Sequence, residues 1–346
     1  MKASPLVLAL FAISMLVVGC TQGTPQQGLT DPFIGGVEGI TMSFQEGTPP
    51  REIYDNGDSS FAIGLQLNNL GESDVGADPI VPNDNRVAYI EITGVNPLQF
   101  GSPQMSKSLA DESITLTRMR KNFDGTQVAG APDVMLFDGF RFTPDIVGNQ
   151  EVRLRANICY DYTTFTNTQV CMKSSTLETV QDNAICTLSG PRDPKNSGSP
   201  VHITSLSQYP LGRQKIQIQF TVENVGTGLI FAPSEFMTSN VNTIFGASPC
   251  DPTQINNPNR NKVYVRVRLN DDSSNALIRC NRLGDTSEGL VTLFAGAPAI
   301  VQCTMEVPQG IGTQAYTDNL RVDLDYMYYQ FVQTPVLVRD VSAGLN

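Results

Sequence analysis

One pattern of alternating side chains occurs twice in this chain, at residues 154–173 and again at residues 320–339. In both copies apolar residues occupy every second position and end on two tyrosines, and a phenylalanine, a threonine and a valine follow. The matched pairs, each 166 positions apart, are Tyr160 and Tyr326, Tyr162 and Tyr328, Phe165 and Phe331, Thr168 and Thr334, and Val170 and Val336. Strict alternation predicts β-strands. We interpret each copy as a β-hairpin that turns at the phenylalanine and closes one of two related domains.

The composition supports two folded domains. A length of 346 residues gives a prior of about two domains. Hydrophobic residues make up 40% and charged residues 16%, so each half can bury a core. The net charge of −11 repels nucleic acid and anionic lipid at long range, which argues against nonspecific binding to either.

The start of the chain predicts a leader for export. Residues 5–18 form an apolar run that is too short for a mature membrane span and suits a signal peptide. The run ends in Val17-Val18-Gly19-Cys20, which resembles the lipobox of lipoprotein signal peptides. The resemblance implies that residues 1–19 are cleaved and that a lipid on Cys20 anchors the chain to the cell membrane or envelope. The polar residues from Thr21 onward predict a flexible extracytoplasmic spacer at 20–38. An ordinary secretory signal with a chance cysteine is the alternative, and an uncleaved anchor is a third interpretation.

Six cysteines remain after Cys20, which predicts three disulfides in an oxidising compartment. Cys159 and Cys171 lie at equal distances from the expected turn at Phe165, so we expect them to face each other across the hairpin. Cys280 and Cys303 flank the next candidate hairpin, residues 276–307. Cys186 and Cys250 are left to pair by default, although six cysteines allow fifteen pairings.

A second pair of matched stretches lies near the start of each half. Residues 61–67 and 216–222 alternate as strands do, and they run into Asn69-Leu70-Gly71 and Asn224-Val225-Gly226, 155 positions apart. A strand followed by Asn-x-Gly resembles the second strand of the immunoglobulin-like cell-adhesion-related domains of bacteria, which are also common in archaeal surface proteins. The resemblance implies that Asn and Gly shape a turn, with the glycine at positive φ.

The remaining strand signals fix the expected architecture. Further strands are expected at 40–44, 87–92, 113–118, 134–142, 263–269, 276–280, 289–294 and 300–307. Such strands, separated by Gly, Pro, Asn and Asp turns and without an amphipathic helix, predict an all-β fold of two tandem immunoglobulin-like antiparallel β-sandwiches. We expect the first sandwich at 39–185, a linker rich in Pro, Gly and Ser at 186–200, and the second sandwich at 201–346.

The sequence offers no catalytic or metal-binding motif. His202 is the single histidine and is expected on the polar face of a strand, so neither a Ser-His-Asp nor a Cys-His device is predicted. Zinc is not expected, because the cysteines lack a C-x-x-C spacing. We therefore predict no enzyme activity and no cofactor. Loops at 55–58, 78–85 and 270–273 carry Asp and Asn that suit calcium, and turn formation explains them equally well.

One exposed stripe suits a binding partner. If Val263, Val265, Val267 and Leu269 face the core, then Lys262, Tyr264, Arg266 and Arg268 share the outer face. An aromatic side chain flanked by arginines can hold an acidic glycan or a surface protein, and a solvated sheet face has the same pattern. Exposed edge strands would also permit self-association by strand addition.

These patterns predict a membrane-anchored surface lipoprotein of a bacterium or an archaeon that acts in adhesion, envelope structure or extracellular assembly. The alternative is a lipoprotein that captures a substrate, or an accessory module of a transporter or a secreted enzyme complex. That alternative predicts a concave site between the domains. The leading hypothesis predicts convex sandwiches with exposed edge strands.

Overall fold

The computed structural model describes residues 31–57, 59–77, 85–173, 186–237, 250–253, 257–269, 277–307 and 315–341. This part of the chain consists of β-strands, turns and three short 3₁₀-helices, which confirms the all-β prediction. The helices are η1 (Pro97–Phe100), η2 (Ser234–Phe236) and η3 (Phe294–Gly296). Residues 33–346 form one compact unit.

Each half of the chain contributes one main sheet of its own, and the first half adds two small sheets. In the first half β1 (Ile40–Phe44), β3 (Phe61–Asn69) and β11 (Asp133–Phe140) pair in the order β1-β3-β11. The same order recurs in β15 (Val201–Gly212), β16 (Lys215–Asn224) and β21 (Ala299–Glu306), to which β13 (Gly190–Arg192) and β19 (Ile278–Cys280) add at the two edges. Ile40 pairs with Asn69 as Val201 pairs with Asn224. The repeat in the sequence is therefore a repeat of strand order and register, and we call the halves the first and second repeat.

Both repeats contribute to one further sheet, the shared sheet, whose main path is β20-β18-β22-β12-β6-β7. These strands are β20 (Glu288–Thr292), β18 (Lys262–Leu269), β22 (Tyr316–Arg339), β12 (Gln150–Met172), β6 (Ala88–Thr93) and β7 (Ser106–Ser108). β14 (Lys195–Asn196) joins β12, and β17 (Leu229–Phe231) and β2 (Glu52–Tyr54) join β22. The shorter strands are β4 (Val75–Ala77), β5 (Asn85–Arg86), β8 (Thr115–Leu116), β9 (Arg120–Lys121) and β10 (Gln127–Val128), which form the small sheets β5-β4-β8 and β10-β9 of the first half.

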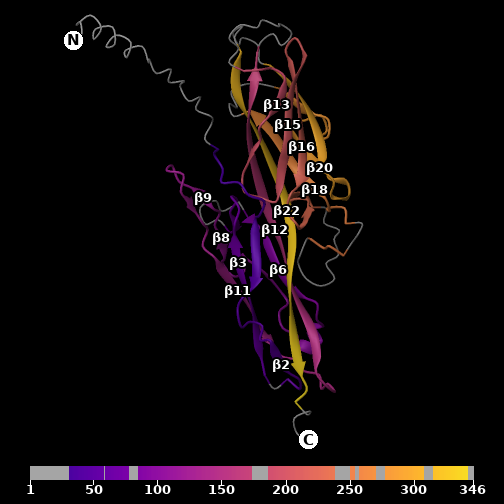
Figure 1. Ribbon diagram of the computed structural model, residues 1–346. Coiled ribbons are helices and arrows are strands. Elements are labelled where there is room, and N and C mark those ends of the chain that lie inside the picture. Colours follow the sequence, from indigo (N-terminus) through magenta and orange to yellow (C-terminus); the bar gives the residue numbers. More distant parts are fainter. Residues whose placement is uncertain are drawn as a thin grey trace, which may run out of the picture. The chain divides into compact units, whose positions relative to one another are not determined.

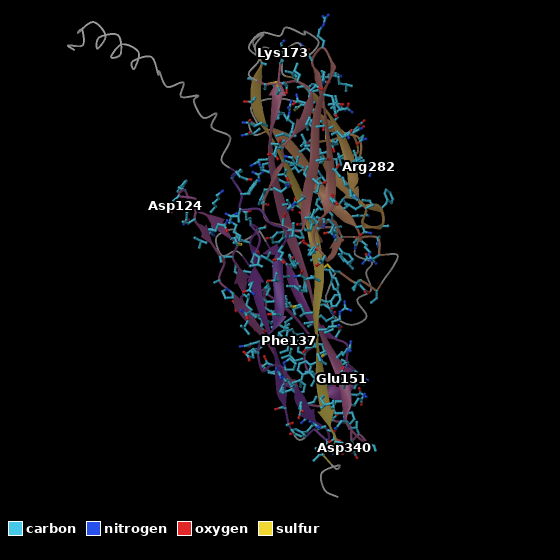
Figure 2. The ribbon with its side chains drawn as sticks, viewed as in Figure 1. Asp124, Phe137, Glu151, Lys173, Arg282 and Asp340 are labelled. Carbon is cyan, nitrogen blue, oxygen red and sulfur yellow. A yellow bond between two sulfur atoms is a disulfide. The ribbon has the colours of Figure 1, made fainter. Side chains whose placement is uncertain are left out.

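β12 and β22 join the two repeats. They pair antiparallel without a register shift from Gln150 opposite Val338 to Met172 opposite Tyr316. Figure 1 shows β22, in yellow, running beside β12, and Figure 2 labels Glu151 and Lys173 near the two ends of β12. The side chains buried between the sheets form one cluster that includes residues of both repeats.

The expected hairpins at residues 154–173 and 320–339 are wrong, because each stretch lies within one continuous strand. The burial pattern gives the reason. In β12 the even-numbered side chains stay buried through Thr164, Thr166 and Val170. The alternation therefore continues unbroken on both sides of Phe165, and no residue there is in a turn. Two-residue periodicity locates a strand and its faces but does not say that a strand ends.

The two copies of the pattern pair with each other. Asp161 pairs with Met327, its own counterpart 166 positions later, while Tyr160 pairs with Tyr328 and Tyr162 with Tyr326. The repeats are thus related by a local two-fold axis that passes through the sheet at Asp161 and Met327. All four tyrosines are buried, and their rings contact one another edge-on or tilted.

The second tyrosine of each copy holds the Asn-x-Gly turn of its own repeat. Tyr162 donates from its hydroxyl to Asn69 Oδ1 at 3.2 Å and accepts from the Ser73 amide at 3.3 Å. In the second repeat the Tyr328 hydroxyl accepts from the Gly228 amide at 2.6 Å. The turns close alike as well, because the amide groups of Asn69 and Asn224 donate to Ser73 O at 2.7 Å and Gly228 O at 2.9 Å.

The glycines of these turns are required for a reason other than the predicted one. Gly71 and Gly226 do not adopt positive φ. Instead, a Cβ on Gly71 would clash with the Tyr162 hydroxyl, and a Cβ on Gly226 with the Tyr328 hydroxyl. The missing side chain lets the tyrosine reach the turn.

Residues 186–200, the expected linker, are packed into the fold. The segment contains β13 and β14, which pair with β15 and β12 of the flanking sequence, and Ser197 and Ser199 are buried. The Gly198 amide donates to Glu72 Oε2 of the first repeat at 2.6 Å. The arrangement therefore differs from two separate sandwiches at 39–185 and 201–346, because the connection and the β12–β22 ladder hold the repeats in one compact unit.

The six cysteines in the described residues form three disulfides, and one has the predicted partners. Cys280 is bonded to Cys303, whereas Cys159 is bonded to Cys250 and Cys171 to Cys186. The pairings Cys159–Cys171 and Cys186–Cys250 are wrong. Because Cys159 and Cys171 lie on one extended strand, twelve residues of about 3.3 Å each separate them by about 40 Å, far beyond disulfide reach.

The predicted leader at residues 1–19, the anchor at Cys20 and most of the spacer lie outside the described residues. In the described ranges, no helix has the length and apolar character needed to cross a membrane. The disulfides point to an oxidising, extracellular location.

Candidate interaction surface

The predicted stripe lies on the face of the shared sheet that points away from the β1-β3-β11 and β15-β16-β21 sheets, which we call the outer face. β18 alternates as expected, with Val263, Val265, Val267 and Leu269 buried and the residues between them partly exposed. The structure therefore brings Lys262, Tyr264, Arg266 and Arg268 onto one face, as the sequence predicts.

Neighbouring strands surround the stripe with groups that the sequence analysis did not select. Across the sheet, Tyr264 lies opposite Asp325, Arg266 opposite Asp323, and Arg268 opposite Arg321. On the other side of β22, β12 places Thr163 opposite Asp325 and Phe165 opposite Asp323. Carboxylates on β22 thus interleave with arginines on β18 and β22.

Ion pairs connect these side chains. Arg266 Nε lies 3.0 Å from Glu288 Oε2, and its Nη1 lies 3.7 Å from Asp325 Oδ2. Arg268 contacts Asp323, and Arg321 Nε donates to the other oxygen of Asp323 at 2.7 Å. The Asp323 carboxylate is 2% exposed, so two arginines compensate one buried charge. The three arginine side chains remain 35–39% exposed, and a ligand could reach their outer edges.

Aromatic rings stack along this stripe. Phe236 from η2 stacks on Tyr264 with 4.2 Å between ring centroids and 14° between planes. The Arg266 guanidinium lies 5.5 Å from the Tyr264 ring centre, and Arg321 lies 4.9 Å from the Phe165 ring centre. The stripe is a preformed layer of arginine, carboxylate and aromatic groups.

Two pKa shifts reflect this environment. Burial raises the pKa of the Tyr264 hydroxyl, and the nearby Glu288 charge adds to the increase. Burial lowers the pKa of Arg266, but the hydrogen bond that Arg266 donates to Glu288 and the charges of Asp325 and Glu288 outweigh this effect, so the pKa is raised in total. Tyr264 therefore stays neutral and Arg266 stays charged at physiological pH.

The local two-fold axis places a related cluster on the other side of the outer face. Arg155 lies 3.6 Å from the Phe331 ring centre, as its counterpart Arg321 lies over Phe165. Arg155 Nε donates to Asn157 Oδ1 at 2.8 Å, where Arg321 donates to Asp323. Sequence reasoning placed both phenylalanines in turns and did not select the arginines. The signal that could have found them is the repeat itself, because Arg155 and Arg321 are 166 positions apart, as are Phe165 and Phe331.

A small apolar cluster separates the two arginine clusters. It contains Cys159, Phe231, Cys250, Met327 and Tyr329, and the disulfide joins Cys250 to Cys159 of β12. Tyr329 accepts from Arg155 at 2.7 Å and donates to Asn157 Oδ1 at 2.8 Å. The outer face therefore has a covered centre and two charged flanks.

His202 is not the surface histidine that the sequence predicts. The side chain is partly buried, and its Nε2 makes no hydrogen bond among the described residues. Burial lowers the pKa of the imidazole, so His202 is mostly neutral at pH 7.

Of the predicted calcium loops, only part of the first and Asn85 of the second are described. Asp55 is buried and its carboxylate accepts from the amides of Val341 at 3.0 Å and Ile146 at 3.2 Å. Asp58, residues 78–84 and residues 270–273 lie outside the described residues. Among the residues that the structure covers, no three His, Cys, Asp or Glu side chains are grouped to hold a metal. Calcium binding stays a prediction.

The comparisons with known proteins add little. No family model matches the sequence. No curated protein matches it either. Among solved structures, the chain is similar to a serine-rich repeat adhesion glycoprotein from Streptococcus agalactiae, with 9% identity, a TM-score of 0.18, and coverage of 87% of this chain and 94% of that chain. A TM-score this low carries no argument about function.

Proposed function

We propose that this protein is a non-catalytic, lipid-anchored cell-surface protein that acts in adhesion, envelope structure or extracellular assembly. The observation that carries the proposal is the uninterrupted β12–β22 ladder, from Gln150–Val338 to Met172–Tyr316. At about 3.4 Å per residue pair, such a ladder spans about 75 Å and joins the repeats into one stiff element. A stiff, disulfide-linked frame with side chains displayed on its outer face suits a structural or adhesive role.

The outer face is the surface that we assign to a partner. Lys262, Tyr264, Arg266 and Arg268 lie on it together with Arg321. Arginine forks and aromatic rings recognise acidic glycans and acidic protein segments. Because Glu288, Asp323 and Asp325 already hold these arginines in place, little side-chain entropy would be lost on binding.

The substrate-capture alternative requires a concave site between the repeats. Along the β12–β22 ladder the repeats are instead hydrogen-bonded directly to each other. Self-association by strand addition remains part of the proposal, because β11 pairs with β3 on one side and with no other described strand.

Anchoring is tested on intact cells. When cells are extracted by detergent phase separation, the wild type is expected in the detergent phase. Cys20→Ser is expected to be absent from the detergent phase and to appear in the medium. Proximity labelling followed by mass spectrometry should then return envelope proteins as neighbours. Only cytoplasmic neighbours, or a wild type that is already in the medium, would exclude the anchor.

Partner binding is tested with a matched pair of double variants. Arg266→Ser/Arg268→Ser removes two charges from the outer face, and Arg279→Ser/Arg282→Ser removes two charges from exposed positions near β19. The first pair is expected to weaken binding to cells or to acidic glycans at least about ten-fold, since charged hydrogen bonds contribute about 1.5–3 kcal/mol each. Equal binding by both pairs would remove the outer face as the binding surface.

A further inference from the structure

Residues 120–129 of the first repeat form an exposed hairpin that belongs to neither main sheet. β9 and β10 form a two-stranded hairpin, with Lys121 opposite Gln127 and Arg120 opposite Val128, and pair with no other described strand. All residues from 120 to 129 are exposed. Figure 2 shows Asp124 at the end of the hairpin, away from the two sheets of this repeat. An isolated hairpin is marginally stable in water, so burial does not explain its presence.

The tip of the hairpin nevertheless has its own network of hydrogen bonds. The Gly125 amide donates to Asn122 O at 2.9 Å, and the Asn122 amide donates to Thr126 O at 2.8 Å. Asp124 Oδ1 accepts from both the amide and the hydroxyl of Thr126, at 2.9 and 2.6 Å. This turn holds Phe123 entirely in solvent, at 113% relative exposure. A preformed turn loses little entropy when the ring is buried by a partner.

The second repeat shows that the fold does not need this hairpin. Both repeats enter the equivalent strands β11 and β21 through Gly-Ala-Pro, at residues 130–132 and 296–298. Before that triplet the second repeat has only the short η3 turn, which carries Phe294 at 73% exposure. The connection from β7 to β11 therefore carries a hairpin, together with β8, that the short connection from β20 to β21 lacks.

The hairpin also lies beside the first residues of the compact unit. Lys121 Nζ donates to the carbonyl of Phe33 at 3.5 Å. Only residues 21–32 separate Phe33 from Cys20, and a chain of that length reaches at most about 45 Å. If Cys20 carries a lipid, Phe33 lies no more than about 45 Å from it, so the hairpin is within reach of the membrane.

We propose that the β9–β10 hairpin binds the anionic lipid surface next to the anchor, with Phe123 inserted among the headgroups and Arg120 and Lys121 beside the phosphates. The proposal rests on the proposed lipid anchor. Phenylalanine is found on the apolar side of segments that lie in the membrane interface, and basic residues near the membrane are attracted to anionic lipids. Residues 120–129 carry two positive charges and one negative charge, opposite in sign to the chain's −11. Distant carboxylates are screened beyond about 8 Å, so the local sign decides.

The absence of tryptophan from the chain permits a direct test. In the mature chain with Cys20→Ser, which has no lipid, Phe123→Trp introduces a single tryptophan at the hairpin, and Phe294→Trp introduces one at the corresponding connection of the second repeat; each is excited selectively over the tyrosines. Each protein is mixed with vesicles of equal parts phosphatidylglycerol and phosphatidylcholine, and with vesicles of phosphatidylcholine alone. The emission maximum and the access of a soluble quencher are measured.

The Phe123→Trp emission is expected to shift to the blue and lose quencher access on the anionic vesicles only, while the Phe294→Trp control does not change. Adding Arg120→Ser and Lys121→Ser should weaken the vesicle affinity at least about ten-fold, at about five-fold per basic residue. No shift for Phe123→Trp, or an equal shift in the control, would overturn the proposal. A blue shift that depends on protein concentration without vesicles would assign the hairpin to a protein contact instead.

Failure of the anchor and failure of the hairpin give different results. If wild-type protein from cells lacks a lipid but Phe123→Trp still shifts on anionic vesicles, the hairpin binds membranes and only the anchor is wrong. If wild-type protein is lipidated and the Phe123→Trp reporter stays in water, the anchor stands and the hairpin proposal falls.

Discussion

The two repeats share their tyrosine-held turns and strand registers but differ at their edges. In the second repeat β13 and β19 extend the sheet on both sides, and the Cys280–Cys303 disulfide links β19 to β21. In the first repeat the equivalent sheet has three strands, and β11 has no described strand on its outer side. The first repeat instead carries the exposed β9–β10 hairpin. What the repeats share maintains the fold, so their differences are where a role specific to one repeat should lie.

The largest expected difference in the free energy of unfolding is between variants that lack one or the other of two disulfides. Cys159–Cys250 links the repeats across 91 residues, whereas Cys280–Cys303 closes 23 residues within the second repeat. The chain-entropy model gives about 4.6 and about 3.4 kcal/mol for loops of these lengths. Denaturant unfolding of Cys159→Ala/Cys250→Ala should show the larger loss in the free energy of unfolding. An equal or smaller loss than for Cys280→Ala/Cys303→Ala would contradict the expectation that the longer loop between the repeats contributes more.

The buried tyrosines predict a loss of stability at alkaline pH. Burial raises the pKa of Tyr328 to about 12, and burial raises the pKa values of Tyr160 and Tyr326 well above their ordinary value. Because the unfolded pKa is about 10, the stabilisation is complete below pH 10 and is lost as the pH rises toward 12. For Tyr328 the loss is about 2.7 kcal/mol over that range.

The slope of the free energy of unfolding against pH measures this effect. Tyr328→Phe should reduce the slope above pH 10 by about 1.4 kcal/mol per pH unit, which corresponds to one proton. Tyr209→Phe removes an exposed hydroxyl and serves as the control. An unchanged slope in Tyr328→Phe would show that this tyrosine does not stay protonated in the folded protein.

The tyrosine-held turns can be compared directly between the repeats. Gly71→Ala and Gly226→Ala each force a Cβ against a tyrosine hydroxyl, and overpacking of this kind costs about 1–3 kcal/mol. Gly71→Ala should cost more, because its Cβ would also lie 2.6 Å from Gly198 O and 2.8 Å from Glu38 O. Thermal unfolding of the two variants measures the difference. A neutral result for both would contradict the clash.

The smallest predicted effect concerns the two arginine–phenylalanine pairs. Arg155→Gln loses a cation–π contact and bonds to neutral partners, for a cost of about 1 kcal/mol. Arg321→Gln also removes one of the two arginines beside the buried Asp323 and should cost about 1 kcal/mol more. Urea unfolding of the two variants tests the order. If Arg155→Gln proved the more destabilising, Asp323 would not depend on Arg321.

Sequence periodicity was sufficient for the local structure. It located β1, β3, β16 and β18 and assigned their buried faces, because alternation depends only on neighbouring residues along one strand. The offset of 166 residues also identified the repeat, and the stripe on β18 lies on the face that was predicted. The number of cysteines predicted three disulfides. The partner of each cysteine could not be predicted, because it depends on contacts between strands that are distant in the sequence.

Only the tertiary structure decided how the strands combine. Whether residues 154–173 bend into a hairpin or continue as one strand depends on β22, which lies more than 140 residues later in the chain and supplies the hydrogen bonds for the whole length of β12. That pairing set the two-fold axis, kept Cys159 from Cys171, and placed Arg321 over Phe165. The physical reason is that alternation specifies the two faces of a strand, whereas the partner at its edge is chosen by packing between distant segments.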